Sequence, residues 1–240
     1  MKLNEKACVG CGKTRSLTPG LPLCPNCVIA LRSAGLSTKM RCPKCLSIVM
    51  PGKPCKVCAR DRTDAIKAAF SPFRYIGTVR SILLRLKFHS DLRGAALLAP
   101  FMRKALGAYR PDCLIPVPLS VQRIKERGFN QADVLCSLVA RDLNVPVLHA
   151  LSRNRDTRRQ TDLKTVQERQ SNVIGAFDAE DFANLSGMRV LLVDDVRTTG
   201  STAIACAEAL KKRGAAEICL LTAAVAPGSG KNMKLKRSSK

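Results

Sequence analysis

The sequence predicts an α/β protein, in which a mostly parallel sheet with helices on both faces follows a small segment folded around metal ions. Three observations support this prediction. Strand-like apolar runs alternate with helical periodicity after residue 60. Four C-x-x-C pairs lie before that residue. The apolar run Val190–Val193 leads directly into two acids and a loop rich in hydroxyl side chains.

Eight cysteines form the four pairs, with twelve, fourteen and nine residues between successive pairs. The paired residues are Cys8 and Cys11, Cys24 and Cys27, Cys42 and Cys45, and Cys55 and Cys58. This spacing is typical of two structural zinc ribbons with four cysteine ligands each, and metal binding would supply folding energy that so few large apolar residues cannot. In the simplest arrangement the first and second pairs share one zinc ion and the third and fourth pairs share the other, although the spacing also permits a crossed arrangement. We expect the other four cysteines, Cys113, Cys136, Cys206 and Cys219, to be core residues.

The elements after the cysteine pairs are predicted from periodicity and apolar runs. A linker with a short helical pattern at 60–72 is followed by helices at 77–89, 91–108, 130–143 and 202–213 and by strands at 113–117, 188–194 and 216–225. Strands that alternate with helices favour a parallel sheet, and ligands bind such sheets beyond the carboxyl ends of the strands.

The strand at 188–194 delivers Asp194 and Asp195 to that end of the sheet. The loop after them, which also opens the helix at 202, consists of Val196, Arg197, Thr198, Thr199, Gly200, Ser201 and Thr202. Backbone N–H groups at a helix N-terminus suit a phosphate, and adjacent carboxylates suit the hydroxyls of a diol. A sugar phosphate is the simplest ligand for both halves. The alternative is a buried strand and a helix capped by Asp195 or Thr198.

Residues 193–202 resemble the signature of the type I phosphoribosyltransferases, which bind phosphoribosyl pyrophosphate (PRPP). The resemblance implies that Asp194 and Asp195 hold the ribose hydroxyls, directly or through Mg²⁺, and that the loop wraps the 5′-phosphate. Arg197 stands where many members carry an apolar or small residue, so its role is open.

Two basic segments extend the resemblance. Residues 116–132, PVPLSVQRIKERGFNQA, bring Arg123, Lys125 and Arg127 to the end of the sheet that carries the acids, where they suit a pyrophosphate. An arginine-dense stretch from Arg153 through Gln160, Leu163, Arg169 and Asn172 to Phe177 is a candidate mobile lid. For each segment the alternative is a solvated basic loop.

With Tyr75 and Lys87-Phe88, these patterns resemble the ComF family of competence-associated, phosphoribosyltransferase-like proteins with an N-terminal double zinc ribbon. The resemblance implies a type I phosphoribosyltransferase-like sheet. It also implies that 116–132 is the pyrophosphate loop, with Arg123 and the catalytic Arg127, and that the second segment covers the site. Lys87 is either a pyrophosphate contact or a solvated lysine at a helix end.

Four regions are expected on these grounds. They are a double zinc ribbon at 1–60, a lead-in at 61–76, a phosphoribosyltransferase-like domain at 77–226 and a basic disordered tail at 227–240.

The formal net charge of +23 arises from 41 basic and 18 acidic residues. Twelve Lys and Arg against two acids lie in residues 1–62, and five more with no acid lie in 231–240. Such an excess points to nucleic acid, bound by the ribbons and the tail mainly through phosphates. The alternative is a charge that serves solubility.

Two functions are therefore compared. One is a phosphoribosyltransferase that uses PRPP and Mg²⁺ and that family resemblance links to DNA uptake. The other is a non-catalytic adaptor that handles incoming DNA beside competence proteins and uses the PRPP site as a sensor. We expect a cytoplasmic protein without membrane insertion, because MKLNEKACVG lacks the apolar core of a signal peptide and the cysteines suit a reducing compartment.

Overall fold

The computed structural model describes residues 7–14, 16–61, 64–154, 175–180 and 183–226, so most of the predicted lid and the whole basic tail lie outside the described residues. The helices are α1 (Pro25–Ser33), α2 (Lys56–Asp61), α3 (Gly77–His89), α4 (Arg93–Ala105), α5 (Val121–Arg127), α6 (Gln131–Leu143) and α8 (Ser201–Lys212). The strands are β1 (Ala68–Phe70), β2 (Phe73–Arg74), β3 (Cys113–Pro116), β4 (Leu151–Arg153), β5 (Phe177–Ala179), β6 (Arg189–Arg197) and β7 (Glu217–Val225).

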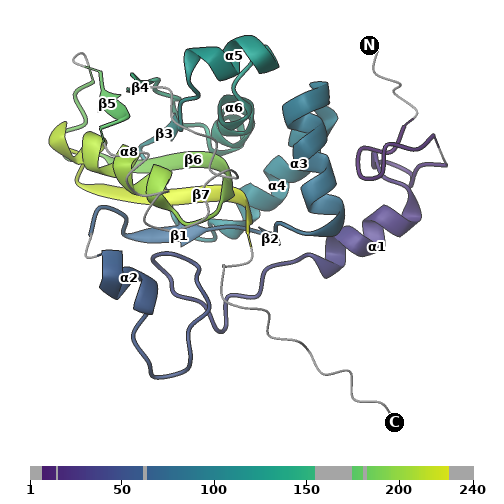
Figure 1. Ribbon diagram of the computed structural model, residues 1–240, viewed down its shortest axis with the longest axis horizontal. Coiled ribbons are helices and arrows are strands. Elements are labelled where there is room, and N and C mark those ends of the chain that lie inside the picture. The colour runs from purple at the N-terminus through teal and green to yellow at the C-terminus, as the bar shows by residue number, and fades with distance from the viewer. Residues whose placement is uncertain (1–6, 15, 62–63, 155–174, 181–182, 227–240) are drawn as a thin grey trace.

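The central sheet is parallel throughout, with the strand order β1-β7-β6-β3 and with β2 paired beyond β1 on the same edge of β7 (Figure 1). The central runs of its two middle strands, Val190–Val193 in β6 and Ile218–Leu221 in β7, are apolar and buried on both faces, as a sheet covered by helices requires. The predicted parallel α/β fold is confirmed. Strands β4 and β5 form a separate antiparallel pair.

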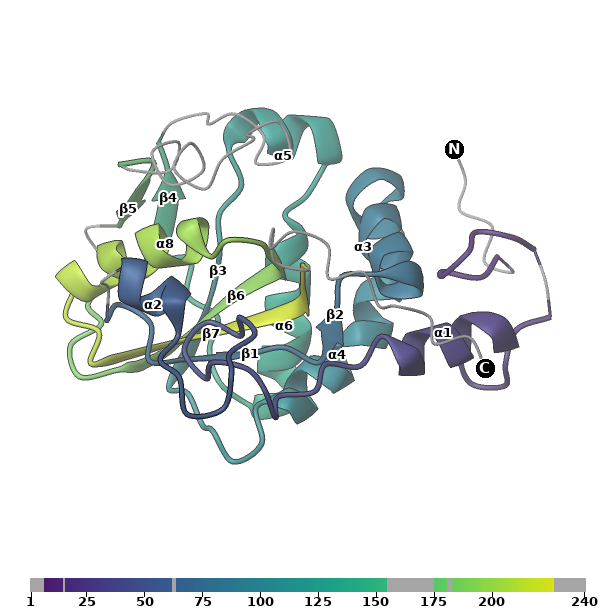
Figure 2. The ribbon, with the colours of Figure 1, turned by 60° about the horizontal axis from the view of Figure 1, so that its bottom comes forward.

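Helices cover both faces of this sheet, as Figures 1 and 2 show from two directions. Leu191 and Val193 of β6 pack in one core cluster with α3, α4 and α6. Val190 and Leu192, on the opposite face, pack in a second cluster with α8. The predicted core cysteines Cys113, Cys136, Cys206 and Cys219 are all buried within these clusters.

Three element predictions need correction. Strand β6 does not stop at 194 but pairs with β7 as far as Arg197, so both acids lie within a strand. Residues 121–127 form the helix α5, which the basic composition of the loop concealed. The stretch 60–72 is not a helical linker, because only its first residues belong to α2 and β1 then joins the sheet edge.

Each group of cysteine pairs packs onto one of the two cores. Val9 and Leu23, near the first two pairs, are fully buried in the cluster of α3 and α4. Leu46, near the third pair, belongs to the cluster of α8. Among the described residues, no helix is long and apolar enough to cross a membrane.

A buried carboxylate links α3, α4 and the segment that begins at Ala7. The side chain of Asp91 is 1% exposed, and Arg93 donates to it with two bonds of 2.9 Å. Arg85 donates to the same carboxylate at 3.2 Å, and Arg93 also reaches the carbonyl of Ala7 at 3.2 Å. Burial raises the pKa of Asp91, but the two guanidiniums outweigh that effect and leave the pKa lowered.

We predict that Asp91→Ala lowers the free energy of unfolding by about 3–5 kcal/mol, because it leaves two partly buried guanidiniums without their acceptor. Since the folded pKa is lowered, this contribution is present above the unfolded pKa and is lost as the pH falls through the folded value. Urea unfolding at pH 7 and at pH 3 measures both effects. Asp142→Ala, at an exposed residue that lies 4.0 Å from Arg141, is the control and should change stability by under about 0.5 kcal/mol.

Candidate functional site

A pocket of about 300 Å³ opens at the carboxyl end of β6. Ten of the twelve residues predicted for sugar-phosphate binding line it, namely Lys87, Arg123, Arg127, Asp194, Asp195, Val196, Arg197, Thr198, Gly200 and Thr202. The other two, Thr199 and Ser201, do not line this pocket, and their hydroxyl groups form a hydrogen bond of 2.9 Å with each other.

The two acids reach the pocket from opposite faces of β6. Asp194 follows Val190 and Leu192 toward α8, whereas Asp195 follows Leu191 and Val193 toward α3. The carboxylate of Asp194 accepts a bond of 2.8 Å from the backbone N–H of Asp195. Burial, followed by the charge of Asp195, raises the pKa of Asp194 to about 7.

Lys87 forms an ion pair with Asp195 from the last turn of α3. Its side chain is only 19% exposed, so it is not the solvated lysine that we considered as an alternative. Burial lowers the pKa of Lys87, but the two carboxylates outweigh burial and leave the pKa raised. The lysine is therefore charged at neutral pH and compensates one acid.

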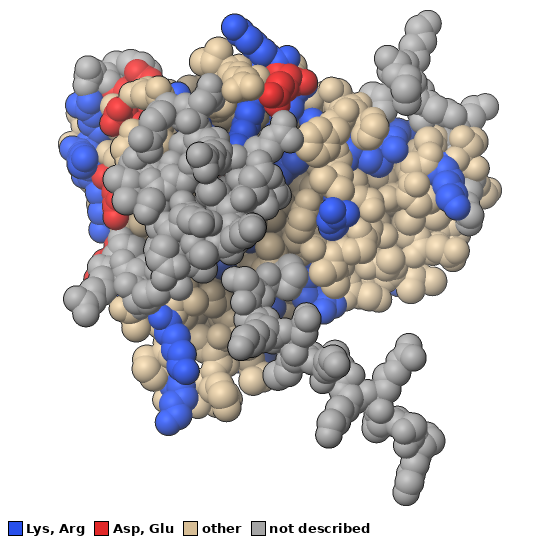
Figure 3. Space-filling view, in the orientation of Figure 1, with Lys and Arg blue, Asp and Glu red and all other residues tan. Residues whose placement is uncertain are grey.

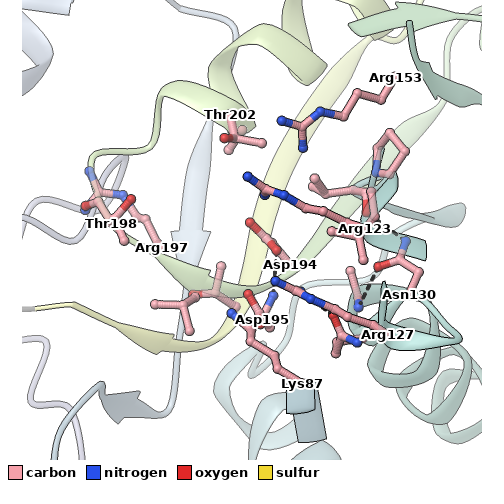
Figure 4. A pocket seen from close by; sticks show the side chains of 18 of the residues that line it. Lys87, Arg123, Arg127, Asn130, Arg153, Asp194, Asp195, Arg197, Thr198 and Thr202 are labelled. Atoms are coloured by element: carbon pink, nitrogen blue, oxygen red, sulfur yellow. Dashed lines mark hydrogen bonds and ion pairs between the residues drawn. The ribbon is translucent and has the colours of Figure 1, made fainter. Parts of the chain in front are cut away.

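Three further arginines line the pocket, with Arg123 and Arg127 on α5 and Arg153 on β4, and Figure 4 shows Arg123 and Arg127 reaching toward the two carboxylates and Arg153 lying beside Thr202. Arg127 donates to Gln131 at 2.8 Å and lies over the ring of Phe88, 5.6 Å from its centroid. These two contacts hold the guanidinium at the pocket.

The loop after β6 leads directly into α8. Gly200 is the N-cap of that helix and has a φ of 90°, in the left-handed region that favours glycine. The side chains of Thr198 and Thr202 line the pocket beside it, so the positive end of the helix dipole faces the cavity. In contrast, Arg197 points away from the carboxylates (Figure 4).

Three further lining residues were not among the predicted site residues, although Tyr75 and Asn130 belong to the motifs that carry the family resemblance. Asn130 caps α6 by accepting from Ala132, and it donates to the carbonyl of Val117 at 2.9 Å, which ties α6 to the end of β3. Thr222 stands opposite Asp194 in the register of β7 and is buried, and its hydroxyl has no partner among the described residues. A single threonine within an apolar strand was the signal that could have revealed it. Tyr75, which follows β2, completes the lining.

The eight paired cysteines form two groups of four, Cys8, Cys11, Cys24 and Cys27, and Cys42, Cys45, Cys55 and Cys58. We call these the first and second clusters. Within each, the sulfur atoms lie within 4.8 Å of one another. A tetrahedral zinc ion with bonds of about 2.3 Å requires sulfur separations near 3.8 Å, so either cluster could hold one. The simplest sequential pairing is therefore the one observed, and the crossed arrangement is excluded.

The first cluster already has one backbone donor in place, since Cys24 N–H donates to Cys8 Sγ at 3.2 Å. Burial raises the pKa of Cys8, but backbone N–H groups outweigh it and lower the pKa to about 7. Such donors favour the thiolate form, which is the form that binds a metal.

In chemical terms the pocket combines two acceptors for hydroxyl groups or a cation with a helix N-terminus and with the cationic side chains of Lys87, Arg123, Arg127 and Arg153. It thus suits a ligand that carries both a diol and phosphates.

Comparison with known proteins identifies a family and relatives that this chain resembles. Residues 93–239 match the family model for the phosphoribosyl transferase domain. The chain is 31% identical to the DNA utilization protein YhgH of Salmonella typhimurium, over 82% of this chain and 87% of that protein. It is 27% identical to the competence protein ComFC of Bacillus subtilis, over 83% of this chain and 82% of that protein. Against the solved glutamine PRPP amidotransferase of B. subtilis, the TM-score is 0.37 at 21% identity, covering 52% of this chain and a quarter (25%) of that one.

The raised pKa of Asp194 predicts a cost to stability at the site. Because its folded pKa exceeds the unfolded value, the charged form is disfavoured on folding, and stability falls as the pH rises from the unfolded pKa toward about 7. We expect Asp194→Asn to stabilise the ligand-free protein, by about 2–3 kcal/mol more at pH 8 than at pH 5, because about two pH units of this range lie below the folded pKa. Urea unfolding at both values measures this difference. The exposed Asp142→Asn is the control, and an equal effect of Asp194→Asn at both pH values would contradict the prediction.

Proposed function

This chain belongs to the ComF family, and from that premise we propose that it binds PRPP with Mg²⁺ and transfers the phosphoribosyl group with release of pyrophosphate. One observation carries the proposal. Two acids, Asp194 and Asp195, line the same pocket at the N-terminus of α8 as three cations, Lys87, Arg123 and Arg127. Carboxylate oxygens are the protein ligands that Mg²⁺ prefers, and arginines suit the phosphates of PRPP.

Each part of the pocket is assigned one task. The acids hold the ribose hydroxyls, and the loop from Thr198 to Thr202 binds the 5′-phosphate with the helix N-terminus behind it. Arg123 and Arg127 hold the pyrophosphate as the bond from ribose C1 to its oxygen breaks and a bond to the acceptor forms. When bound, Mg²⁺ supplies positive charge to the leaving pyrophosphate.

Zinc is the proposed ion of both cysteine clusters. Four cysteines close the coordination shell, so each ion has a structural role and brings a charge of −2 with its thiolates. Two filled sites would reduce the formal charge of the chain from +23 to about +19.

We predict that Asp194→Asn and Asp195→Asn each weaken PRPP binding in the presence of Mg²⁺ by at least about tenfold, since a charge-assisted bond contributes roughly 1.5–3 kcal/mol. Arg127→Met should do the same, while Lys125→Met, on the same helix but outside the pocket, is the matched control. Calorimetry measures the affinities, and a screen for released pyrophosphate over nucleobases and ammonia tests turnover. A wild-type protein that fails to bind PRPP at millimolar concentration would overturn the proposal.

A second function, the handling of DNA, is favoured by the basic excess at both ends of the chain. In Figure 3, Lys and Arg side chains are scattered over the end that carries the first cluster and α1, and no described acidic side chain is visible there. A scattered distribution suits contact with phosphates and no particular base sequence. Here the PRPP pocket would serve as a sensor, in an adaptor that acts beside competence or DNA-processing proteins.

Salt dependence tests this second function. We expect DNA of unrelated sequences to bind with similar affinity and with a steep decline of log K against log salt concentration. Deletion of residues 231–240 should reduce the slope by up to about 4, since the segment carries five basic residues and each phosphate contact contributes about 0.7–0.9. Asp194→Asn, which leaves the basic residues intact, should bind DNA as the wild type does. Absence of binding at low salt would leave only the PRPP function.

A further inference from the structure

The second cluster shares a cavity with the phosphate loop. This small space, of about 30 Å³, lies between Cys45 and Cys58 on one side and Arg197, Thr199 and Gly200 on the other. Thr199 lines this cavity and not the PRPP pocket, whereas Thr198 lines the PRPP pocket alone, so the loop has two faces, one toward each cavity. The first cluster lies beside α3 instead, since Gly10, between Cys8 and Cys11, packs against Cys27 and against Thr78 of that helix.

Arg197 fills the space behind the loop. Its residue is only 7% exposed, and its guanidinium donates to the carbonyls of Thr199 at 3.3 Å and of Thr198 at 3.5 Å. A Cβ at Gly200 would lie 3.3 Å from Nε of Arg197, so the guanidinium packs directly against the loop backbone. The side chain therefore contacts three consecutive residues of the phosphate loop.

These contacts orient the loop for an anion. In a planar trans peptide the C=O and N–H groups point in opposite directions. Because the carbonyls of Thr198 and Thr199 face Arg197, the N–H groups of Thr199 and Gly200 face away from it, on the side where Thr198 and Gly200 line the PRPP pocket. Successive N–H groups with this orientation form a concave site for a phosphate.

The second cluster stands on the other side of the same guanidinium. A zinc ion with four thiolates carries a charge of −2 and attracts a neighbouring guanidinium. Burial raises the pKa of the Cys45 thiol, and the guanidinium of Arg197 is among the groups that oppose the rise, as its proximity requires. Arg197 thus lies between an anionic metal centre and the backs of the loop peptides.

We propose that Arg197 is a positioning residue that couples the metal of the second cluster to the phosphate loop. The filled cluster holds the guanidinium against the loop carbonyls, and loss of the metal releases it and lowers the affinity for the 5′-phosphate. This inference rests on the proposed PRPP function. It makes phosphate binding responsive to zinc supply through the second cluster, whereas loss of zinc from the first cluster leaves phosphate binding unchanged.

Matched cysteine variants test the coupling in the full chain. Cys45→Ser and Cys11→Ser each remove one ligand, from the second and the first cluster respectively, and each should lower the zinc content from two ions to about one. Only Cys45→Ser should weaken binding of ribose 5-phosphate, by about tenfold in calorimetry. Arg197→Met should weaken it equally, the double variant no further, and Arg197→Lys should recover part of the affinity.

Inorganic pyrophosphate separates positioning from general damage. It is expected to bind at Arg123 and Arg127, so Arg197→Met should leave its affinity unchanged, whereas a distorted pocket would weaken both ligands. If the wild type binds neither ribose 5-phosphate nor PRPP, the proposed function itself fails. If the wild type binds and Arg197→Met binds equally well, the coupling is wrong and the proposed function stands. Arg197→Met changes no metal ligand. Its affinity for ribose 5-phosphate therefore tests the coupling even if Cys45→Ser fails to fold.

Discussion

The placement of two neighbouring carboxylates in a buried strand is the constraint on which the site depends. Asp194 and Asp195 face opposite sides of β6, so no single helix can compensate both, and unpaired buried charges are costly. Lys87 from α3 compensates the charge on one side, and arginines from α5 and β4 lie around the opening of the pocket. Segments far apart in the sequence therefore converge at the end of β6.

The two cysteine clusters lie at different parts of this arrangement, the first beside α3 and the second beside the phosphate loop. Arg93 joins Asp91, in the turn after α3, to the carbonyl of Ala7 beside the first cluster, and α3 carries Lys87. The second cluster lies behind the loop that follows the acids. Metal-bound segments suit these positions, because closed coordination fixes a short chain that has little apolar core of its own.

The sequence was sufficient for features with local signals. Apolar runs predicted β6 and β7, periodicity predicted α3 and α6, and spacing predicted both cysteine clusters. The sequence was insufficient where the structure or role of a residue depends on a partner that is distant in the chain. The continuation of β6 past Asp195 depends on pairing with β7, α5 looked like a solvated loop, and the lone Thr222 mattered only once β7 lay beside Asp194. Similarly, Arg197 had no assignable role until the second cluster was seen beside it.

The balance of charge also restricts what the pocket can bind. The ion pair between Lys87 and Asp195 satisfies both partners in the absence of a ligand, so a lone anion must compete for the lysine and a lone cation for the carboxylate. A ligand that brings metal charge to the acids and phosphate charge to the cations replaces both halves of the pair at once. Phosphoribosyl pyrophosphate with Mg²⁺ has this property, whereas a simple phosphate or a free metal ion does not. The selectivity of the pocket for such a ligand would then arise from the ion pair of the ligand-free state as much as from any single contact with the ligand.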